Sequence, residues 1–92
     1  MTVTVHLPAM LRSYCRTASE TLSVAGESVQ SVLSQLETSH PAIYQCVCDE
    51  TGAVRRHINL FVNSSLVRTP EAMTALLRPG DELFIMTAVS GG

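Results

Sequence analysis

The sequence predicts an α+β fold in which one main helix packs across a mixed β-sheet. Several short segments alternate apolar and polar residues, as strands buried on one face do. One longer segment instead repeats its apolar residues at helical spacing. With 92 residues, 46% hydrophobic and 15% charged, the chain is expected to form a single globular domain with one core.

The first two strands are expected to form an antiparallel hairpin. Residues 3–7 alternate apolar with polar side chains, and Pro8 ends the strand because proline cannot donate to a ladder. A polar loop is predicted over residues 12–19. Alternation returns over residues 20–24, close enough in sequence to pair with the first strand.

The main helix is predicted to begin after Ser28, whose hydroxyl can cap free amides of the first turn. Its apolar stripe consists of Val29, Val32, Leu33 and Leu36. The helix is expected to end near Thr38, ahead of Pro41. Residues 42–47 suggest a short additional helical turn, and residues 49–54 a loop.

The second half of the chain supplies the remaining strands. Residues 58–62 alternate again, and a turn over residues 63–65 leads into a short strand at 66–67. A short helix is predicted over residues 71–77. The side chains expected to pack inward from it are Met73, Leu76 and Leu77.

A strong turn precedes the last strand. Pro79 and Gly80 occupy the positions that proline and glycine prefer in a type II turn. The strand over residues 82–86 holds four consecutive apolar residues, which is typical of a central strand covered on both faces or nearly so. Residues 87–92 then leave the fold as a tail.

This order of elements predicts a β-grasp (ubiquitin-like) roll, with the first and last strands parallel and adjacent. The expected organisation is a β-grasp domain over residues 1–86 and a flexible tail, residues 87–92, that ends in diglycine. Gly91 and Gly92 have no Cβ, so such a tail fits a narrow channel in whatever conformation the channel imposes. The α-carboxylate of Gly92 is a group that another enzyme can activate.

Charge and composition argue against several classes of function. The net charge of −2, without a basic cluster, gives no reason to expect nucleic-acid binding. The sequence has neither an apolar run long enough to span a membrane nor a signal peptide, so a cytoplasmic protein is expected. The chain has no lysine, which excludes chains of this protein linked through its own lysine amines.

Cysteines and histidines are read as structural residues. Cys15, Cys46 and Cys48 do not make a complete metal set, and buried or half-buried thiols are expected instead. The three histidines are scattered, with no carboxylate or nucleophile expected around them. No catalytic constellation is evident, so the protein is not expected to be an enzyme, to bind a metal or to hold a cofactor.

The chain resembles the MoaD/ThiS family of ubiquitin-like sulfur carriers, and within it the CysO type. The segments that carry the resemblance are Phe61-Val62-Asn63 with Leu66-Val67-Arg68, the turn Pro79-Gly80-Asp81-Glu82-Leu83, Leu11-Arg12 after the first strand, and the end Ala88-Val89-Ser90-Gly91-Gly92. The resemblance covers nearly the whole chain.

The resemblance implies a carrier that partner enzymes act on. A ubiquitin-activating-type adenylyltransferase would use ATP to activate Gly92, and sulfide or a persulfide enzyme would convert it to a thiocarboxylate. Gly91, Ser90, Val89 and Ala88 would thread the tail into the partner. The acceptor would be a cysteine-synthase-like or molybdopterin-synthase-like enzyme, with cysteine the favoured product and molybdopterin, thiamin or another sulfur metabolite as alternatives.

Strand alternation also predicts a docking surface. If Ile58, Leu60 and the residues in register with them face the helix, Phe61, Phe84 and Met86 face the other side of the sheet. With Leu66 they would form an apolar patch for partner docking, unless the loops at residues 12–19 or 49–57 cover it.

Three other functions remain open. The first is a protein modifier that joins Gly92 to lysines of target proteins. The second is a small subunit of a molybdopterin-synthase-like complex. The third is a regulatory module that does not use its tail.

Overall fold

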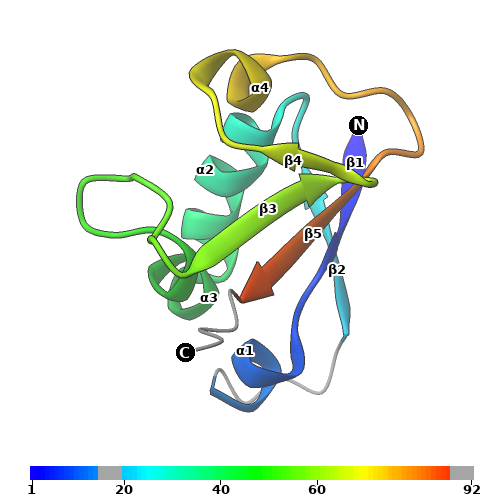
Figure 1. Cartoon of the computed structure of the whole chain (residues 1–92). Coiled ribbons are helices and arrows are strands. Elements are labelled where there is room, and N and C mark those ends of the chain that lie inside the picture. Colours follow the sequence, from blue (N-terminus) through cyan, green and yellow to red (C-terminus); the bar gives the residue numbers. More distant parts are fainter. Residues whose placement is uncertain (15–19, 88–92) are drawn as a thin grey trace.

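A five-stranded mixed sheet forms the centre of the fold in the computed structural model, which describes residues 1–14 and 20–87. The strands are β1 (Thr2–His6), β2 (Thr21–Ala25), β3 (Ile58–Val62), β4 (Ser65–Val67) and β5 (Glu82–Thr87). Their order in the sheet is β2-β1-β5-β3-β4. β1 and β5 are parallel, and the other neighbours are antiparallel. The predicted β-grasp roll, with its first and last strands side by side, is therefore confirmed (Figure 1).

The longest helix, α2 (Val29–Ser39), begins at the predicted cap. The Ser28 hydroxyl accepts from the Ser31 backbone amide at 3.2 Å, and the Ser31 hydroxyl accepts from the Ser28 amide at 2.9 Å. This reciprocal pair satisfies two amides that the first turn leaves unpaired. The whole predicted apolar stripe of α2 is buried against the sheet.

A second helix, α3 (Pro41–Val47), follows directly and confirms the short helix predicted there. Pro41 occupies the first turn, where its missing amide hydrogen costs nothing. The loop after α3 is held by Asp49, whose carboxylate accepts from the amides of Thr51 and Ala53. In Figure 1, α2 and α3 lie together beside the sheet.

The core lies between these helices and one face of the sheet. Its buried side chains include Val3, Val5, Val24, Val29, Val32, Leu33, Leu36, Ile43, Val47, Ile58, Leu60, Val67, Leu83 and Ile85. On β5, burial alternates. Leu83 and Ile85 are buried, Phe84 is half-buried and Met86 is exposed. The expectation that this strand is covered on both faces was wrong, because helices cover the sheet on the Leu83 face alone among the described residues.

A helix occupies part of the segment predicted as a loop over residues 12–19. α1 (Ala9–Tyr14) begins after Pro8, whose carbonyl accepts from the Arg12 amide at 3.1 Å. Leu7 and Leu11, four residues apart, are both buried in the core. This apolar pair anchors the short helix and was the signal that the sequence prediction missed. Residues 15–19 lie outside the described residues.

The fourth helix is shorter than predicted. α4 (Pro70–Thr74) is capped by Thr69, whose hydroxyl accepts from the Ala72 amide at 3.1 Å. Ala75 then takes an extended conformation and ends the helix. Met73 and Leu77 pack on the core as expected, but Leu76 is 79% exposed. The chain is extended at this point, and the Leu77 amide donates to the Glu27 carbonyl, so Leu77 rather than Leu76 is held against the core.

The turn before β5 has the predicted geometry. The Asp81 amide donates to the Arg78 carbonyl at 3.0 Å, and Gly80 has a φ of +91°. A positive φ of this size is easily adopted only by glycine. The turn sets the register in which β5 enters between β1 and β3.

Candidate functional site

The sheet face opposite the helices gathers the four predicted docking residues. Phe61 on β3 lies opposite Phe84 on β5 and opposite Leu66 on β4. Met86 lies two residues beyond Phe84 on the same face. We call Phe61, Leu66, Phe84 and Met86 the open-face patch.

Within residues 1–14 and 20–87, nothing covers the open-face patch; residues 15–19 of the other loop considered as a cover lie outside the described residues. Met86 is 48% exposed and Leu66 is 43% exposed, while both phenylalanines are half-buried. The loop after α3 does not cover it, because Val54 of that loop packs on the core side. Two exposed apolar side chains beside two half-exposed aromatic rings form a surface suited to partner docking.

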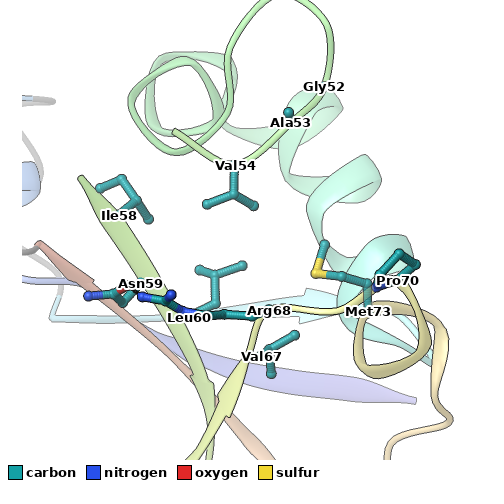
Figure 2. A pocket seen from close by; sticks show the side chains of 10 residues that line it. All are labelled: Gly52, Ala53, Val54, Ile58, Asn59, Leu60, Val67, Arg68, Pro70 and Met73. Atoms are coloured by element: carbon teal, nitrogen blue, oxygen red, sulfur yellow. Dashed lines mark hydrogen bonds between the residues drawn. The ribbon is translucent and has the colours of Figure 1, made fainter. Parts of the chain in front are cut away.

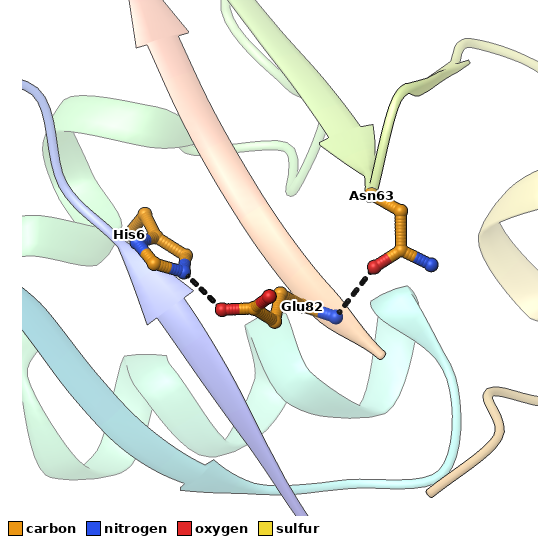
Figure 3. Close-up of polar contacts among 3 residues, drawn as sticks. All are labelled: His6, Asn63 and Glu82. Atoms are coloured by element: carbon orange, nitrogen blue, oxygen red, sulfur yellow. Dashed lines mark hydrogen bonds and ion pairs between the residues drawn. The ribbon is translucent and has the colours of Figure 1, made fainter. Parts of the chain in front are cut away.

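A polar cluster borders the patch on the β1 side. The His6 ring stacks on Phe84 with centroids 4.2 Å apart and planes 9° apart. His6 Nε2 lies 2.6 Å from Glu82 Oε1, and the Glu82 amide donates to Asn63 Oδ1 at 3.2 Å (Figure 3). The expectation that no carboxylate surrounds a histidine was wrong for His6. The contact arises because parallel pairing sets β1 beside β5, 76 residues later in the chain.

A hollow of about 440 Å³ lies between the loop after α3, the β3–β4 pair and α4 (Figure 2). Its floor is apolar, with Val54, Leu60 and Met73 among the side chains that line it. At its rim, Arg68 Nη2 donates to Asn59 Oδ1 at 3.5 Å. Asn59 pairs with Met86, so the guanidinium group lies beside the Met86 end of the open-face patch.

A second hollow, of about 340 Å³, lies where β5 ends. Thr87, the last residue that the structure describes, lines it together with Arg55 and His57. Arg55 is oriented by a bond from Nε to the Gln45 carbonyl at 2.8 Å. The predicted tail residues Ala88, Val89, Ser90, Gly91 and Gly92 lie outside the described residues.

The thiols have the structural character expected of them where the structure describes them. Cys48 is buried and Cys46 half-buried, and neither forms a disulfide; Cys15 lies outside the described residues. Burial raises the pKa of the Cys48 thiol, an effect that a hydrogen bond with Tyr44 partly offsets. Across residues 1–14 and 20–87, no three His, Cys, Asp or Glu side chains gather into a metal site. Within the same residues, no helix is long and apolar enough to cross a membrane.

The chain is similar to known proteins over its whole length. The family model that matches residues 5–92 is described as the ThiS family. Sulfur carrier protein CysO of Mycobacterium tuberculosis is 31% identical over 94 residues, which cover 100% of both chains.

Solved structures share the fold as well. A chain of the BexX/CysO complex of Amycolatopsis orientalis matches with a TM-score of 0.80 and 31% identity, over 98% of this chain and 99% of that chain. Small archaeal modifier protein 1 of Methanosarcina acetivorans matches with a TM-score of 0.78 and 33% identity, over 99% of this chain and 96% of that chain. The structural likeness includes the sheet that carries the open-face patch, and the family match in sequence extends to Gly92.

Proposed function

This chain belongs to the ThiS family, and from that premise we propose that it is a sulfur carrier, a protein co-substrate rather than an enzyme. One observation carries the proposal. The similarity to a protein described as a sulfur carrier spans the whole chain, and the family match includes Gly91 and Gly92.

The proposed chemistry takes place at the Gly92 carboxylate. In the active site of a ubiquitin-activating-type enzyme, this carboxylate attacks the α-phosphorus of ATP and pyrophosphate leaves. A carboxylate is a poor electrophile, but the acyl adenylate that forms has AMP as a good leaving group. Sulfide then attacks the acyl carbon and expels AMP, which leaves a thiocarboxylate on Gly92. With a persulfide enzyme as the sulfur donor, a further thiol must cleave the acyl disulfide that results.

The fold suits this role because the tail continues directly from the central strand. Thr87 is paired with Ile58 of β3, so it is a fixed point from which the tail starts. Five residues follow Thr87, which gives Gly92 a reach of about 17 Å when extended. Ala88, Val89, Ser90 and Gly91 carry at most small side chains through the partner's channel.

In this proposal, the β-grasp domain docks on the partner enzyme through the open-face patch. It lies on the strand from which the tail continues, so a partner that binds the patch also holds the start of the tail. The BexX/CysO complex supports the expectation that such carriers form complexes with partner proteins.

The acceptor of the sulfur is proposed to be a cysteine-synthase-like enzyme that acts on an activated serine derivative. Similarity to CysO supports this choice. The thiocarboxylate sulfur would displace the activating group at the serine β-carbon, and hydrolysis would then return Gly92 as a carboxylate.

Mass spectrometry of the untagged protein from its native cells tests the proposal. After trapping with a thiol-reactive alkylator, fragment ions should place a sulfur on Gly92. Fragmentation is necessary because replacing oxygen by sulfur adds nearly the same mass as one oxidation of Met or Cys. Gly91→Val should remove the Gly92 sulfur, because the added side chain blocks the channel.

Ala53→Val is the matched control. Ala53 lies exposed in the loop after α3, so this variant gains two of the three carbon atoms that Gly91→Val adds, away from the tail, and should keep the sulfur. A plain carboxylate on Gly92 in every preparation, or a Gly91→Val protein that still carries sulfur, would contradict the proposal.

A protein modifier is the second candidate, and one observation favours it. Small archaeal modifier protein 1 shares the fold at 33% identity. The same peptide analysis separates the two functions, since a modifier would show Gly92 joined to lysine side chains of other proteins.

A further inference from the structure

The open-face patch carries charges of opposite sign at the two ends of β5. Glu82 begins the strand, and its side chain is 45% exposed. Four residues later, Met86 lies opposite Asn59, to which the Arg68 guanidinium is bonded. The two ends are about 13 Å apart along the strand. The apolar side chains of the patch lie between a carboxylate and a guanidinium group.

The other charged side chains nearby do not cancel this difference in charge between the two ends of the patch. At the Glu82 end, Asp81 and Arg78 share one turn and offset each other, while Glu27 adds negative charge ahead of α2. At the tail end, Arg12 pairs with Glu20 at 3.6 Å. The loop that follows α3 contributes both signs, from Asp49, Glu50, Arg55 and Arg56. Glu82 and Arg68 therefore remain the charges that flank the patch.

His6 borders the acidic end of the patch. Its ring packs flat on Phe84 while Nε2 contacts the Glu82 carboxylate (Figure 3). The residue facing it from β2 is Thr21, which carries no charge. His6 therefore holds both the carboxylate and the aromatic ring at this end of the patch.

We propose that this charge polarity fixes the orientation in which the open-face patch binds its partner enzyme. The partner that fits presents an apolar surface with a cationic group at the Glu82 end and an anionic group at the Arg68 end. His6 acts as a positioning residue that holds the Glu82 carboxylate and the Phe84 ring. This inference rests on the proposed function, because the partner is the adenylating enzyme.

Polarity matters for a carrier because its tail has a direction. An apolar strip alone is equally attractive in two opposite orientations, and only one of them points the tail into the partner's active site. In the reversed orientation, Glu82 would meet the partner's anionic group and Arg68 its cationic group. Such like-charge contacts disfavour wrong arrangements, and complementary rim charges speed the correct encounter.

Steady-state adenylation kinetics test the inference, with the adenylating enzyme of the same organism and pyrophosphate release as the readout. Glu82→Gln and Arg68→Gln should each raise the KM for the carrier about two- to five-fold at low salt, as exposed ion pairs allow. The kcat should stay unchanged, and the KM effect should shrink as salt screens the charges. Glu37→Gln on α2 and Arg56→Gln in the loop after α3 are the matched controls, with the same charge changes outside the patch.

The His6 variants separate its two contacts. His6→Phe keeps a ring on Phe84 but loses the contact with the Glu82 carboxylate, and His6→Gln keeps a donor for Glu82 but loses the stack. If His6 positions the carboxylate, the KM for the carrier should rise in His6→Phe and stay near the wild-type value in His6→Gln, with kcat unchanged in both.

Two outcomes of the charge variants overturn the inference. An unchanged KM in both charge variants does so, as does an equal rise in the two controls, which would indicate a response to net charge alone. A wild-type KM in His6→Phe removes the role given to His6. If the wild-type carrier is not adenylated at all, the proposed function fails together with the inference, whereas normal adenylation with unaltered KM values overturns the inference only.

Discussion

Asp81 ties the turn before β5 to the turn between β3 and β4. Its Oδ2 accepts from the Arg78 amide at 2.8 Å, and its Oδ1 accepts from Asn63 Nδ2 at 3.0 Å. These bonds, the Arg78 amide first, favour the ionised form and lower the pKa of the Asp81 carboxyl. The charge of a single side chain thus helps to hold the entry of the central strand.

Asp81→Asn should make stability less dependent on pH. A carboxylate whose pKa is lowered in the folded state contributes stability above its unfolded pKa, and that contribution is lost as the pH falls through the folded pKa. The wild type should therefore lose more of its free energy of unfolding than Asp81→Asn between about pH 5 and pH 2. Urea titrations at each pH measure this difference.

Glu50→Gln is the control for this comparison, because Glu50 is exposed in the loop after α3. Its stability should follow the wild-type pH dependence closely. Parallel curves for the wild type and Asp81→Asn would contradict the role given to Asp81.

Single residues also show which contacts could be predicted from the sequence and which could not. Alternation placed Phe61, Phe84 and Met86 on one face correctly, because the side-chain period of a strand is two in any sheet. It could not place His6 beside Glu82, because that contact depends on the register between strands 76 residues apart. The roles predicted for the tail residues, Ala88 to Gly92, remain predictions.

At the scale of elements, the sequence predicted correctly the position of those segments that carry their own start and stop signals. α2 has a capping serine, a complete apolar stripe and a following proline, and it was found where it was expected. α1 has only Leu7 and Leu11 as an apolar pair, too few for a periodic signal, so it was missed. α4 was predicted too long because the extended Ala75 ends it without a glycine or proline.

Ser28→Ala should cost the protein about 1 kcal/mol of unfolding free energy. The variant loses the hydroxyl that accepts from the Ser31 amide, which leaves a first-turn donor of α2 unpaired. Ser34→Ala, on the exposed face of the same helix, should change stability by less than about 0.5 kcal/mol. Equal losses in the two variants, measured by urea unfolding, would show that the cap contributes nothing specific.

At the scale of the whole molecule, the sheet divides two tasks between its faces. One face packs on α2 and α3 and supplies the core. The other presents the open-face patch, with Leu66 and Met86 exposed. Since these two side chains contribute little to the core, changes to them should affect partner binding without affecting the fold.

Leu66→Ser and Met86→Ser should each weaken binding to the adenylating enzyme by roughly tenfold, about 1.4 kcal/mol, because each removes apolar surface from the interface. The unfolding free energy should change by less than about 0.5 kcal/mol. Leu76→Ser makes a comparable change at a 79% exposed site outside the patch and should bind normally. Isothermal titration calorimetry and thermal melts separate the two effects, and unaltered binding in both patch variants would exclude the docking role.

The central place of β5 also determines how the molecule bears mechanical load. A partner that pulls on the chain beyond Thr87 pulls along β5, and this strand is bonded to β3 over residues 83–87 and to β1 in parallel over residues 82–84. Force along a strand stretches the ladder bonds on both edges together, so they must break almost at once rather than one after another. Forced unfolding depends on the height of that barrier more than on equilibrium stability. The domain is therefore built to stay folded when a load is applied to the chain beyond Thr87.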